Sequence, residues 1–508
     1  MIRIVRIVVS GIVLAAFVAG VILPGEFGGR LADIVARMQF FPALQQWNAT
    51  SKIVLTIILV PVLTLIFGRI YCSIICPLGI IQDLFMRRKR KFAYRESNKV
   101  IRWIFPAAIL FLGVLGVPVL VTLFEPFAVS GRIVDNLILP AAATVYSPFV
   151  LWMRHFDIYL NPLTAAFALS ATILAAAQLA GIIGLVIWRG RFYCNSICPV
   201  GAVLSVLSQF SILGIRINRE KCVSCGICRN ACKAECIDLE NFRVDSGRCV
   251  GCFSCLGNCP RDAISYGLRE RLSRAETAAV SGSIVPQNPM TRRDFLVMTG
   301  AAACTVPAGM LLKRVARPDL ERGIAPPGAG SVAKFNAACT GCHLCISKCP
   351  EKVLRPAFGQ YGLAGFQQPV LDFSAGYCAY QCNTCGQVCP NGAIRPLDLY
   401  TKQHTSIGIA ALERSTCVAW AEDKACGACD EVCPVKAVHM IPNPKGAGYP
   451  TVPEMRPELC LGCGACENVC PRYSIRVTAR TVHAPVTFEK PPTTDHKAEP
   501  PPTDGFAF

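Results

Sequence analysis

Four uncharged, apolar runs stand out along the first part of the chain. They cover residues 7–23, 53–68, 103–124 and 163–188. As helices, all four are about long enough to cross a hydrocarbon core of roughly 30 Å, the second only just. A set of buried globular helices is the alternative, but four such runs within residues 7–188 would need a very large core. The pattern therefore predicts an α-helical membrane domain with four spans.

The distribution of Lys and Arg predicts the orientation of these spans. Nine such residues lie between the second and third runs, five of them consecutive at 87–91, whereas the loops after the first and third runs hold three and two. Because cytoplasmic loops are enriched in Lys and Arg, the N-terminus and the loop at 87–91 should be cytoplasmic. Residues 136–153 are also uncharged but contain Pro140 and Pro148. We interpret them as a re-entrant or interfacial segment on the outer face, because a further span would reverse the side of everything after it.

Two short motifs follow the second and fourth runs. Each consists of Tyr, Cys, three further residues, Cys and Pro, followed by an apolar residue and Gly. The repeat suggests two equivalent helix pairs, and cysteines four apart on a helical turn share one face. The four thiols should lie at the cytoplasmic interface, where they could form a redox relay or a seventh metal centre. Reducible disulfides or inert thiols are the alternative. These candidate redox residues are Cys72, Cys76, Cys194 and Cys198.

A two-cluster ferredoxin pattern comes directly after the fourth run. It reads C-x2-C-x2-C-x3-C twice, and the fourth cysteine of each motif is expected to bind the neighbouring cluster. Zinc sites more often pair C-x2-C units across a longer gap. Lys233 stands where a proline is usual, and Cys236 is an extra cysteine without an assigned role. The predicted [4Fe–4S] ligands are Cys222, Cys225, Cys228 and Cys259 for one cluster, and Cys249, Cys252, Cys255 and Cys232 for the other.

Four more cysteine groups lie in the last third of the chain. All four share the core C-x2-C-x3-C-P, and the second and third groups have a longer gap before it. They predict four further [4Fe–4S] clusters, for a total of six, arranged as two ferredoxin-like pairs. The pairing is either sequential or nested, with the first group beside the fourth. The groups are Cys339, Cys342, Cys345 and Cys349; Cys378, Cys382, Cys385 and Cys389; Cys417, Cys426, Cys429 and Cys433; and Cys460, Cys463, Cys466 and Cys470.

A second targeting feature separates the two halves. The stretch Thr291-Arg-Arg-Asp-Phe-Leu296 precedes an Ala- and Gly-rich run that ends at Leu312. It resembles a twin-arginine export signal, here internal, and the run would form a fifth helix that leaves the last cluster domain in the periplasm. The alternatives are a basic pair before an ordinary membrane helix, or a run packed in a soluble domain that keeps everything cytoplasmic. Cys304, inside the run, is interpreted as a structural cysteine rather than a lipidation site.

Composition supports a multi-domain protein that combines membrane and soluble parts. Hydrophobic residues make up 53% of the 508 residues, and the mean hydropathy is +0.43. Thirty cysteines beside long apolar spans argue against a small disulfide scaffold. Much of the net charge of +18 lies beside the spans, so nucleic acid is not expected as a partner. The predicted domains are the helical membrane domain (1–215), a cytoplasmic two-cluster α+β ferredoxin domain (216–268), a linker with the signal helix (269–313), a periplasmic four-cluster ferredoxin-like domain (314–482) and a disordered tail (483–508).

Together, these motifs resemble a known family of membrane ferredoxins. The first 270 residues resemble the NapH branch of the NosR/NapH proteins, with four helices, two C-x3-C-P motifs and a two-cluster ferredoxin. Residues 291–482 resemble NapG, an exported four-cluster partner, through the stretches at 291–296, 325–328 and 417–420. Both partners would be fused in this chain. On the resemblance alone, the nested pairing of the C-terminal groups is favoured.

The resemblance implies a quinol dehydrogenase of the bacterial inner membrane that serves an anaerobic respiratory chain. The membrane half would oxidise menaquinol, and the outer clusters would pass electrons to a periplasmic cytochrome or reductase. Glu125, His155 and Asp157 lie on the predicted outer face and are candidate residues for taking up quinol protons. Polar residues near a membrane surface are more often merely solvated.

Two other functions stay open. The first is a transmembrane conduit that takes electrons from a cytoplasmic donor without quinone chemistry. It would have to bridge the bilayer through quinone or the four C-x3-C-P cysteines, because no histidine lies within a predicted span. The second is a maturation factor that uses its clusters as a redox sensor, for which six clusters would be excessive.

Overall fold

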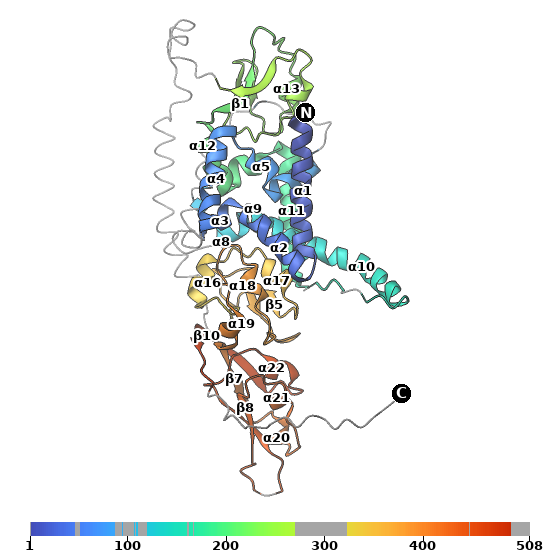
Figure 1. The fold of residues 1–508 in the computed structure, drawn as a ribbon, viewed down its shortest axis with the longest axis vertical. Helices are drawn as coiled ribbons and strands as arrows, with labels where there is room; N and C mark the ends of the chain where they lie inside the picture. The colour runs from blue at the N-terminus through green and yellow to red at the C-terminus, as the bar shows by residue number, and fades with distance from the viewer. Residues whose placement is uncertain are drawn as a thin grey trace, which may run out of the picture.

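The computed structural model describes residues 2–45, 51–86, 94, 106, 108–109, 119–159, 162–165, 167–269, 323–446 and 448–488. The molecule is elongated, and three parts follow one another along its long axis (Figure 1). A helical domain occupies the middle. The cysteine-rich segment 213–268, called here the N-terminal module, lies at one end. The segment 323–488, called the C-terminal module, covers the opposite end.

Three helices among the described residues are long and apolar enough to cross a membrane. They are α1 (Ile2–Ile22), α11 (Leu169–Arg189) and the continuous run Pro126–Arg154. That run comprises α9 (Pro126–Ile133), a π-helical turn η1 (Val134–Ile138) and α10 (Leu139–Arg154). These helices are consistent with a membrane protein, while the predicted count of four or five spans stays a prediction.

The other predicted spans are shorter or only partly described. Helix α4 (Ser51–Phe67) has 17 residues and contains Pro61. Of the third apolar run, 103–124, the structure describes only a few residues and the final helix α8 (Val119–Phe124). The fourth run becomes helical only at Leu169 because Ala168 before it has an extended backbone. The first run extends further toward the N-terminus than predicted, since α1 begins at Ile2 and includes Arg6, which is buried in an ion pair with Asp83.

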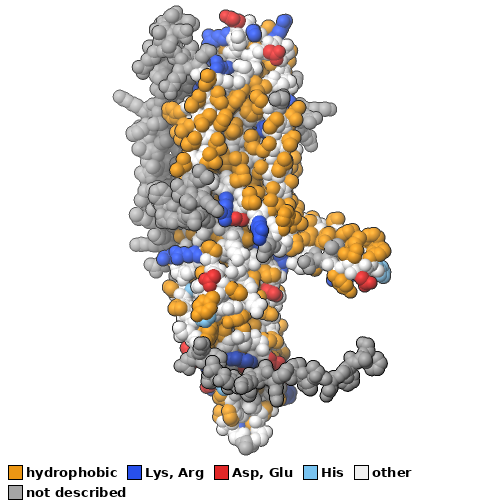
Figure 2. All heavy atoms as spheres, in the orientation of Figure 1, with side chains coloured by type: hydrophobic (Ala, Val, Ile, Leu, Met, Phe, Trp, Pro, Cys, Tyr) orange, Lys and Arg blue, Asp and Glu red, His pale blue; other side chains and the backbone are white. Residues whose placement is uncertain are grey.

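The surface of the helical domain is apolar. Figure 2 shows hydrophobic side chains over its visible face, with Lys and Arg gathered toward the ends. On α1, the exposed side chains include Ile4, Val8 and Ile12, and α11 exposes Ile173 and Trp188. Soluble proteins rarely expose a continuous apolar surface of this extent. Helices α2 (Gly25–Arg37) and α3 (Phe40–Gln45) complete this side of the domain, with α2 packed on α1.

Helix α10 leaves the bundle sideways. It runs crosswise to α1 at the level where the helical domain meets the C-terminal module (Figure 1). The rings of Tyr146, Phe149, Trp152 and Phe156 contact one another in succession along it. The segment 136–153 is therefore not a separate element, because it continues the helix that begins at Pro126. Its length and composition would allow a span, but its direction differs from those of α1 and α11.

Both C-x3-C-P motifs form tight turns between two helices. The first contains α5 (Tyr71–Ile74) and leads into α6 (Pro77–Phe85), and the second contains η2 (Tyr193–Ile197) and leads into α12 (Pro199–Ser208). The amide of the second cysteine bonds the carbonyl of the preceding tyrosine in both turns, at 3.1 and 2.9 Å. Proline then occupies the first helical position, where its fixed φ and missing N–H are tolerated.

The two cysteine-rich modules contain short helices and two-stranded sheets. In the N-terminal module, β1 (Leu213–Ile217) pairs with β4 (Ile264–Leu268), and β2 (Ile237–Asp238) pairs with β3 (Arg243–Val244). Both pairs are antiparallel, and Leu213 lies opposite Leu268. The module also holds α13 (Ile227–Ala231) and the 3-10 turn η3 (Leu256–Asn258).

The C-terminal module has three such strand pairs. Its antiparallel pairs are β5 (Leu354–Pro356) with β6 (Pro369–Leu371), β7 (Thr405–Leu412) with β10 (Ile475–Pro485), and β8 (Val438–Ile441) with β9 (Val452–Met455). Strand β10 extends into the segment predicted as a disordered tail, because Ala484 and Pro485 pair with β7. The helices are α16 (Val332–Ala338), α17 (Leu344–Lys348), α18 (Thr384–Gln387), α19 (Leu399–Gln403), α20 (Val418–Ala421), α21 (Ala428–Glu431) and α22 (Ala465–Val469).

Candidate iron–sulfur centres

The eight predicted ligands of the N-terminal module form two groups of four. One cavity is lined by Cys222, Cys225 and Cys228 together with Cys259 from the second motif. Beside it, Cys249, Cys252 and Cys255 lie within electrostatic reach of Cys232 from the first motif. In both groups, three closely spaced cysteines are joined by the displaced cysteine of the other motif, as the spacing predicts.

The sixteen cysteines of the C-terminal module follow the same rule, in sequential order. The first group is completed by Cys389 of the second, and the second by Cys349 of the first. The third is completed by Cys470 of the fourth, and the fourth by Cys433 of the third. The nested pairing favoured by the resemblance is therefore wrong. Adjacent groups exchange their displaced cysteines, because Cys349 reaches forward to the second group while Cys389 reaches back to the first.

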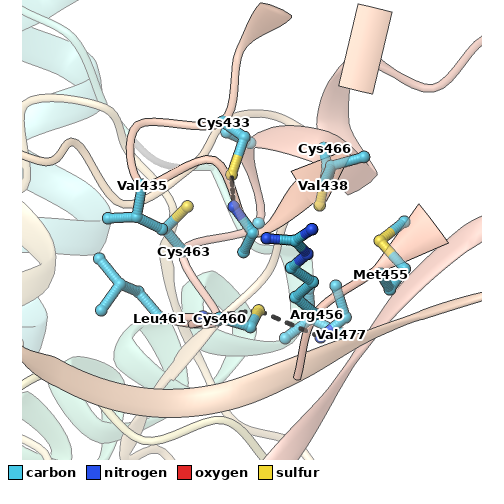
Figure 3. A pocket seen from close by; sticks show the side chains of 15 residues that line it. Cys433, Val435, Val438, Met455, Arg456, Cys460, Leu461, Cys463, Cys466 and Val477 are labelled. Atoms are coloured by element: carbon cyan, nitrogen blue, oxygen red, sulfur yellow. Dashed lines mark hydrogen bonds between the residues drawn. The ribbon is translucent and has the colours of Figure 1, made fainter. Parts of the chain in front are cut away.

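The last of these cavities illustrates the fit to a cluster. Figure 3 shows Cys433, Cys460, Cys463 and Cys466 around it. The amide of Ala437 donates to Cys433 Sγ at 3.1 Å, and the amide of Ala410 donates to Cys460 Sγ at 3.4 Å. Equivalent amides reach three other displaced cysteines, at 3.3 to 3.4 Å: Cys259, Cys389 and Cys470. Such N–H donors stabilise cluster-bound thiolates and tune their potential.

Four of the cysteine groups surround open cavities. Within the described parts of the chain, no three His, Cys, Asp or Glu side chains lie close enough to share one metal ion. A zinc ion would draw four sulfurs to about 2.3 Å from one centre. A cube of iron and sulfur binds one ligand at each iron corner, so its four cysteines stand further apart around an open cavity. The four cysteine-lined cavities have this form.

The two C-x3-C-P motifs meet inside the helical domain, and the buried cluster of their four cysteines is called here the C-x3-C-P chamber. All four cysteines are buried and belong to one apolar core. They lie within electrostatic reach of one another. The turns pack against each other inside the domain and beneath the N-terminal module, and their predicted position at the cytoplasmic membrane interface stays a prediction. The side-chain amide of Gln82 also faces this chamber, since Cys194 Sγ donates to its oxygen at 3.5 Å.

Two buried arginines cross the chamber in a two-fold arrangement. Arg69 approaches Cys72 Sγ at 4.0 Å and donates to the carbonyl of Cys194 at 2.8 Å. Arg191 approaches Cys194 Sγ at 3.9 Å and donates to the carbonyl of Cys72 at 3.2 Å. Each guanidinium therefore approaches the sulfur of its own motif and binds the backbone of the other. Both arginine side chains are fully buried.

These arginines were missed in the reading of the sequence, although a signal exists. Both motifs are preceded by Gly and Arg, so the repeat reads Gly-Arg-x-Tyr-Cys and begins at Gly68 and Gly190. Both glycines have a positive φ, 78° and 56°, which glycine adopts without strain. The repeat therefore extends further toward the N-terminus than the cysteines alone indicate.

The N-terminal module is fixed to the helical domain beside this chamber. Arg69 also donates to Gly247 O at 2.7 Å, and Ser73 donates to Gly251 O at 3.3 Å. Lys233 forms an ion pair with Asp83 at 3.0 Å, and Asp83 also pairs with Arg191 at 2.8 Å. Although burial favours the neutral acid, Arg191, Lys233 and Arg6 together hold the pKa of Asp83 well below its usual value. The lysine in place of the usual proline thus has a structural role.

Cys236, the extra cysteine, lies next to the second cluster site. Its sulfur is 3.4 Å from Cys232 Sγ, and its side chain also neighbours Cys249. It is buried with them in one core. A fifth thiol in this position either donates a hydrogen bond to the cluster ligands or competes with Cys232 as the ligand.

The C-terminal module meets the opposite end of the helical domain at its first cysteine group. Arg132 donates to Gly341 O at 3.0 Å, and Asn136 Nδ2 lies 3.0 Å from His343 Nδ1. Lys348 donates to the carbonyl at the end of α1, and burial lowers the pKa of Lys348 to about 8. Residues 339–343 also spell C-x-x-C-H, a haem-attachment pattern. Here the other imidazole nitrogen of His343 lies 3.1 Å from Gln367 O, so both ring nitrogens have protein partners.

The three candidate quinol residues are not brought together. Glu125 is buried in the helical domain, where its carboxylate caps α9 by accepting from Phe127 N and Ala128 N. His155 and Asp157 are exposed beyond the end of α10. The twin-arginine-like stretch 291–296, the apolar run to 312 and Cys304 lie outside the described residues, as does the basic loop at 87–91.

Comparison with family models agrees with these sites. A model described as a 4Fe-4S binding domain matches residues 53–95 and 171–219, which contain the two C-x3-C-P motifs. Two models described as 4Fe-4S dicluster domains match residues 338–394 and 424–473. The first of these two matches contains two adjacent cysteine groups and the second contains two adjacent groups except for Cys417, in agreement with sequential pairing.

Several known proteins are similar to parts of the chain. The ferredoxin-type protein NapF of Escherichia coli K12 is 30% identical over 141 residues, which cover 28% of this chain and 75% of NapF. The methylamine utilization ferredoxin-type protein MauM of Paracoccus denitrificans is 30% identical over 188 residues, covering 34% and 80%. An uncharacterized protein of Methanocaldococcus jannaschii is 25% identical over 180 residues, covering 35% of this chain and 57% of that protein. The chain thus spans little more than half the length of that relative.

The fold, the cysteine groups and the comparisons define an iron–sulfur electron-transfer protein with helices apolar enough to span a membrane. The chain belongs to the ferredoxin-type 4Fe-4S proteins.

Proposed function

We propose that this protein is a membrane-bound electron carrier with six [4Fe–4S] clusters that oxidises menaquinol and passes the electrons to a periplasmic reductase or cytochrome. The observation that carries the proposal is the order of the cysteine groups along the molecule. Two groups lie at one end of the helical domain and four at the other (Figure 1). Iron–sulfur clusters exchange single electrons, and a line of them carries electrons over a distance.

The C-terminal module is built as such a line. The first two groups exchange one ligand each, because Cys349 completes the second group and Cys389 completes the first. The last two groups do the same through Cys433 and Cys470. The two pairs are also joined directly, because Cys378 N donates to Cys463 O at 2.9 Å. Backbone contact between ligand loops leaves little protein between neighbouring groups. The chain's contribution is to hold the groups in order, shield them from water and donate amides to their sulfurs.

The quinol step is supported by the resemblance to NapH and NapG and by the apolar surface of the helical domain. A quinol in the bilayer would reach the helices from the side. Of the three candidate proton acceptors, Glu125 alone lies within the helical domain, close to both the C-x3-C-P chamber and the first C-terminal group. We place the C-terminal module on the periplasmic side of a bacterial inner membrane, following the Lys and Arg distribution, and α10 at that membrane surface.

One structural observation favours the conduit as a second candidate function. The two cluster modules lie at opposite ends of the helical domain, and a pure quinol dehydrogenase with a periplasmic acceptor would not need the N-terminal module. A cytoplasmic donor would deliver electrons to that module, and the helical domain would pass them on.

An anaerobic reduction experiment separates the two functions. The full chain, purified in detergent with its clusters, is mixed with a reduced menaquinol analogue, and cluster absorbance and EPR are followed. Rapid reduction of the clusters supports quinol oxidation. If dithionite reduces the clusters and quinol leaves them oxidised, the quinol step is refuted and the conduit is favoured.

A further inference from the structure

We propose that Cys72, Cys76, Cys194 and Cys198 hold a seventh iron–sulfur cluster inside the helical domain, where it links the two cluster modules and its negative charge is balanced by Arg69 and Arg191. The inference depends on the proposed function only in that electrons cross the helical domain.

The two halves of the chamber are equivalent. The two motifs bring two cysteines each, in turns of the same backbone form, and the four thiols share one buried core. A cluster bound by four thiolates needs four soft ligands around one space, and a two-fold repeat supplies them in two equal halves. Gly79 and Gly201 occupy equivalent positions, and a Cβ atom on either would overlap the carbonyl of Cys72 or Cys194, respectively. Both halves therefore lack room for a side chain at the same position.

Arg69 brings a buried positive charge to the chamber. Its hydrogen-bond partners are the carbonyls of Cys194 and Gly247 and the side-chain oxygen of Asn195, all neutral. Among the residues that the structure describes, no carboxylate forms an ion pair with it. A fully buried guanidinium without an anion is costly, because its charge has lost its hydration. A thiolate-bound cluster is anionic and would lie within reach of both arginines.

The disulfide alternative fits the chamber less well. Two disulfides would be neutral and would leave Arg69 without a counter-charge. Inert thiols would do the same, because burial favours the protonated form of a cysteine. Gln82 gives a further indication, since its side-chain nitrogen is fully buried without a hydrogen-bond partner and its oxygen faces Cys194. A buried amide donor beside these cysteines suits an acceptor such as a cluster sulfide.

The chamber is connected by direct contacts to elements beside both cluster modules. On one side, the loop that carries Cys249 and Cys252 contacts the chamber, because Gly251 packs on Ile70 and accepts from Ser73. On the other side, Tyr193 donates to Phe124 O at 2.6 Å, and Arg132 from the next helix donates to Gly341, between two ligands of the first C-terminal group. Helix α11, with 21 residues, is roughly 30 Å long. The second motif follows the end of α11, and Glu125 lies within electrostatic reach of both Cys76 in the chamber and Cys342 in the C-terminal module.

The electron balance is simple. One electron enters from the neighbouring group of one module and one electron leaves to the neighbouring group of the other. No bond forms or breaks, and no proton or further reactant is required.

The first test is the cofactor content of the full chain, with iron and acid-labile sulfide measured per polypeptide alongside the Mössbauer spectrum. We expect the double variant Cys194→Ser/Cys198→Ser to lose one cluster of seven and to keep the signals of the other six. A matched control, Cys225→Ser, removes a ligand from the N-terminal module and should leave the buried centre intact. Unchanged iron and sulfide in the double variant would overturn the proposal. This measurement needs no electron donor, so failure of quinol oxidation does not affect it.

Two milder variants, both at Arg69, test the same centre with less risk of misfolding. Arg69→Lys keeps the positive charge, so the seventh centre should be retained. Arg69→Gln removes the positive charge, so the centre should have a lower reduction potential or be lost from the protein. The other six clusters report on folding in both variants. If both variants have the same cluster content and potentials as the parent chain, the arginine has no role in charge balance.

The second test asks whether the centre links the modules. The protein is inserted into sealed vesicles, and dithionite, which does not cross the membrane, is added outside. In the parent chain we expect the clusters of both modules to be bleached. In Cys194→Ser/Cys198→Ser we expect only the clusters of the outward-facing module to be bleached. Complete bleaching of both modules in this variant would refute the link even if the seventh cluster exists.

Discussion

The Nζ atom of Lys233 lies 3.0 Å from Oδ1 of Asp83, across the boundary between the N-terminal module and the helical domain. The lysine follows a cluster ligand, Cys232, where ferredoxin motifs usually have proline, and its carbonyl accepts from Arg191 N at 3.0 Å. Asp83 in turn binds Arg191, which approaches the C-x3-C-P chamber. A residue that departs from the motif therefore joins the module to the chamber.

Replacing Lys233 should weaken this attachment. Lys233→Met leaves Asp83 with Arg6 and Arg191, so we expect a loss of roughly 1–3 kcal/mol in the docking of the module rather than unfolding. The measurement is limited proteolysis or hydrogen exchange of segment 213–268 in the full chain. As a control, Lys436→Met breaks the exposed pair with Asp430 and should cost less than about 1 kcal/mol. Equal protection in the parent chain and Lys233→Met would contradict the assignment.

Cys236 should tune the cluster beside it. A thiol that donates to Cys232 stabilises the reduced cluster, so Cys236→Ala should lower the potential of the cluster at Cys249, Cys252 and Cys255 by on the order of tens of millivolts. Cys236→Ser keeps a donor and should restore part of the shift. The check is a redox titration followed by EPR.

A different result in the same variants would reassign the ligand. If Cys236→Ala loses this cluster while Cys232→Ala keeps it, Cys236 is the true fourth ligand.

The glycine after each C-x3-C-P motif should not tolerate a side chain. Gly201→Ala would drive its Cβ into the carbonyl of Cys194 and toward Arg69, and Gly79→Ala would do the same at Cys72 and Arg191. We expect a destabilisation of a few kcal/mol with disruption of the chamber. Gly181→Ala and Gly184→Ala in α11 are controls, because nothing lies within 4 Å of the added atoms. Better helix propensity should make them neutral or slightly stabilising. Thermal unfolding and cluster content measure both effects, and equal behaviour of the two pairs would refute the packing argument.

Burial of His483 should make strand β10 sensitive to acid. Burial lowers the pKa of His483 to about 4, from an ordinary value of 6.5. The folded state therefore disfavours the proton, so its stability contribution is complete above pH 6.5 and is lost as the pH falls toward 4. Between pH 7.5 and 5.5 we expect a loss of roughly 1 kcal/mol. Hydrogen exchange of Ile475–Pro485 is measured at each pH in the parent chain and in His483→Gln. The difference between the two proteins gives the contribution of the histidine to the pH dependence. An identical change in both proteins would exclude the histidine as its source.

The sequence alone determined the chemistry of this protein. Thiolate ligands of a cluster are set by local spacing, so the C-x2-C-x2-C-x3-C pattern identified the ferredoxin motifs, and their grouping with a displaced fourth cysteine agrees with the structure. Apolar runs likewise indicated helices, because lipid requires a length of uninterrupted apolar residues that is visible in one dimension. The repeat of C-x3-C-P after two of these runs pointed to two equivalent halves.

Only the tertiary structure decided which distant groups meet. It paired the C-terminal cysteine groups in sequence, separated Glu125 from His155 and Asp157, and placed Arg69 and Arg191 across one chamber. It also gave Lys233 and Cys236 their neighbours. Two of these relationships join residues more than a hundred positions apart, because Arg69 meets Arg191 and Lys233 meets Asp83. Spacing along the chain fixes which side chains can share one turn, but long-range packing fixes which charges are buried together.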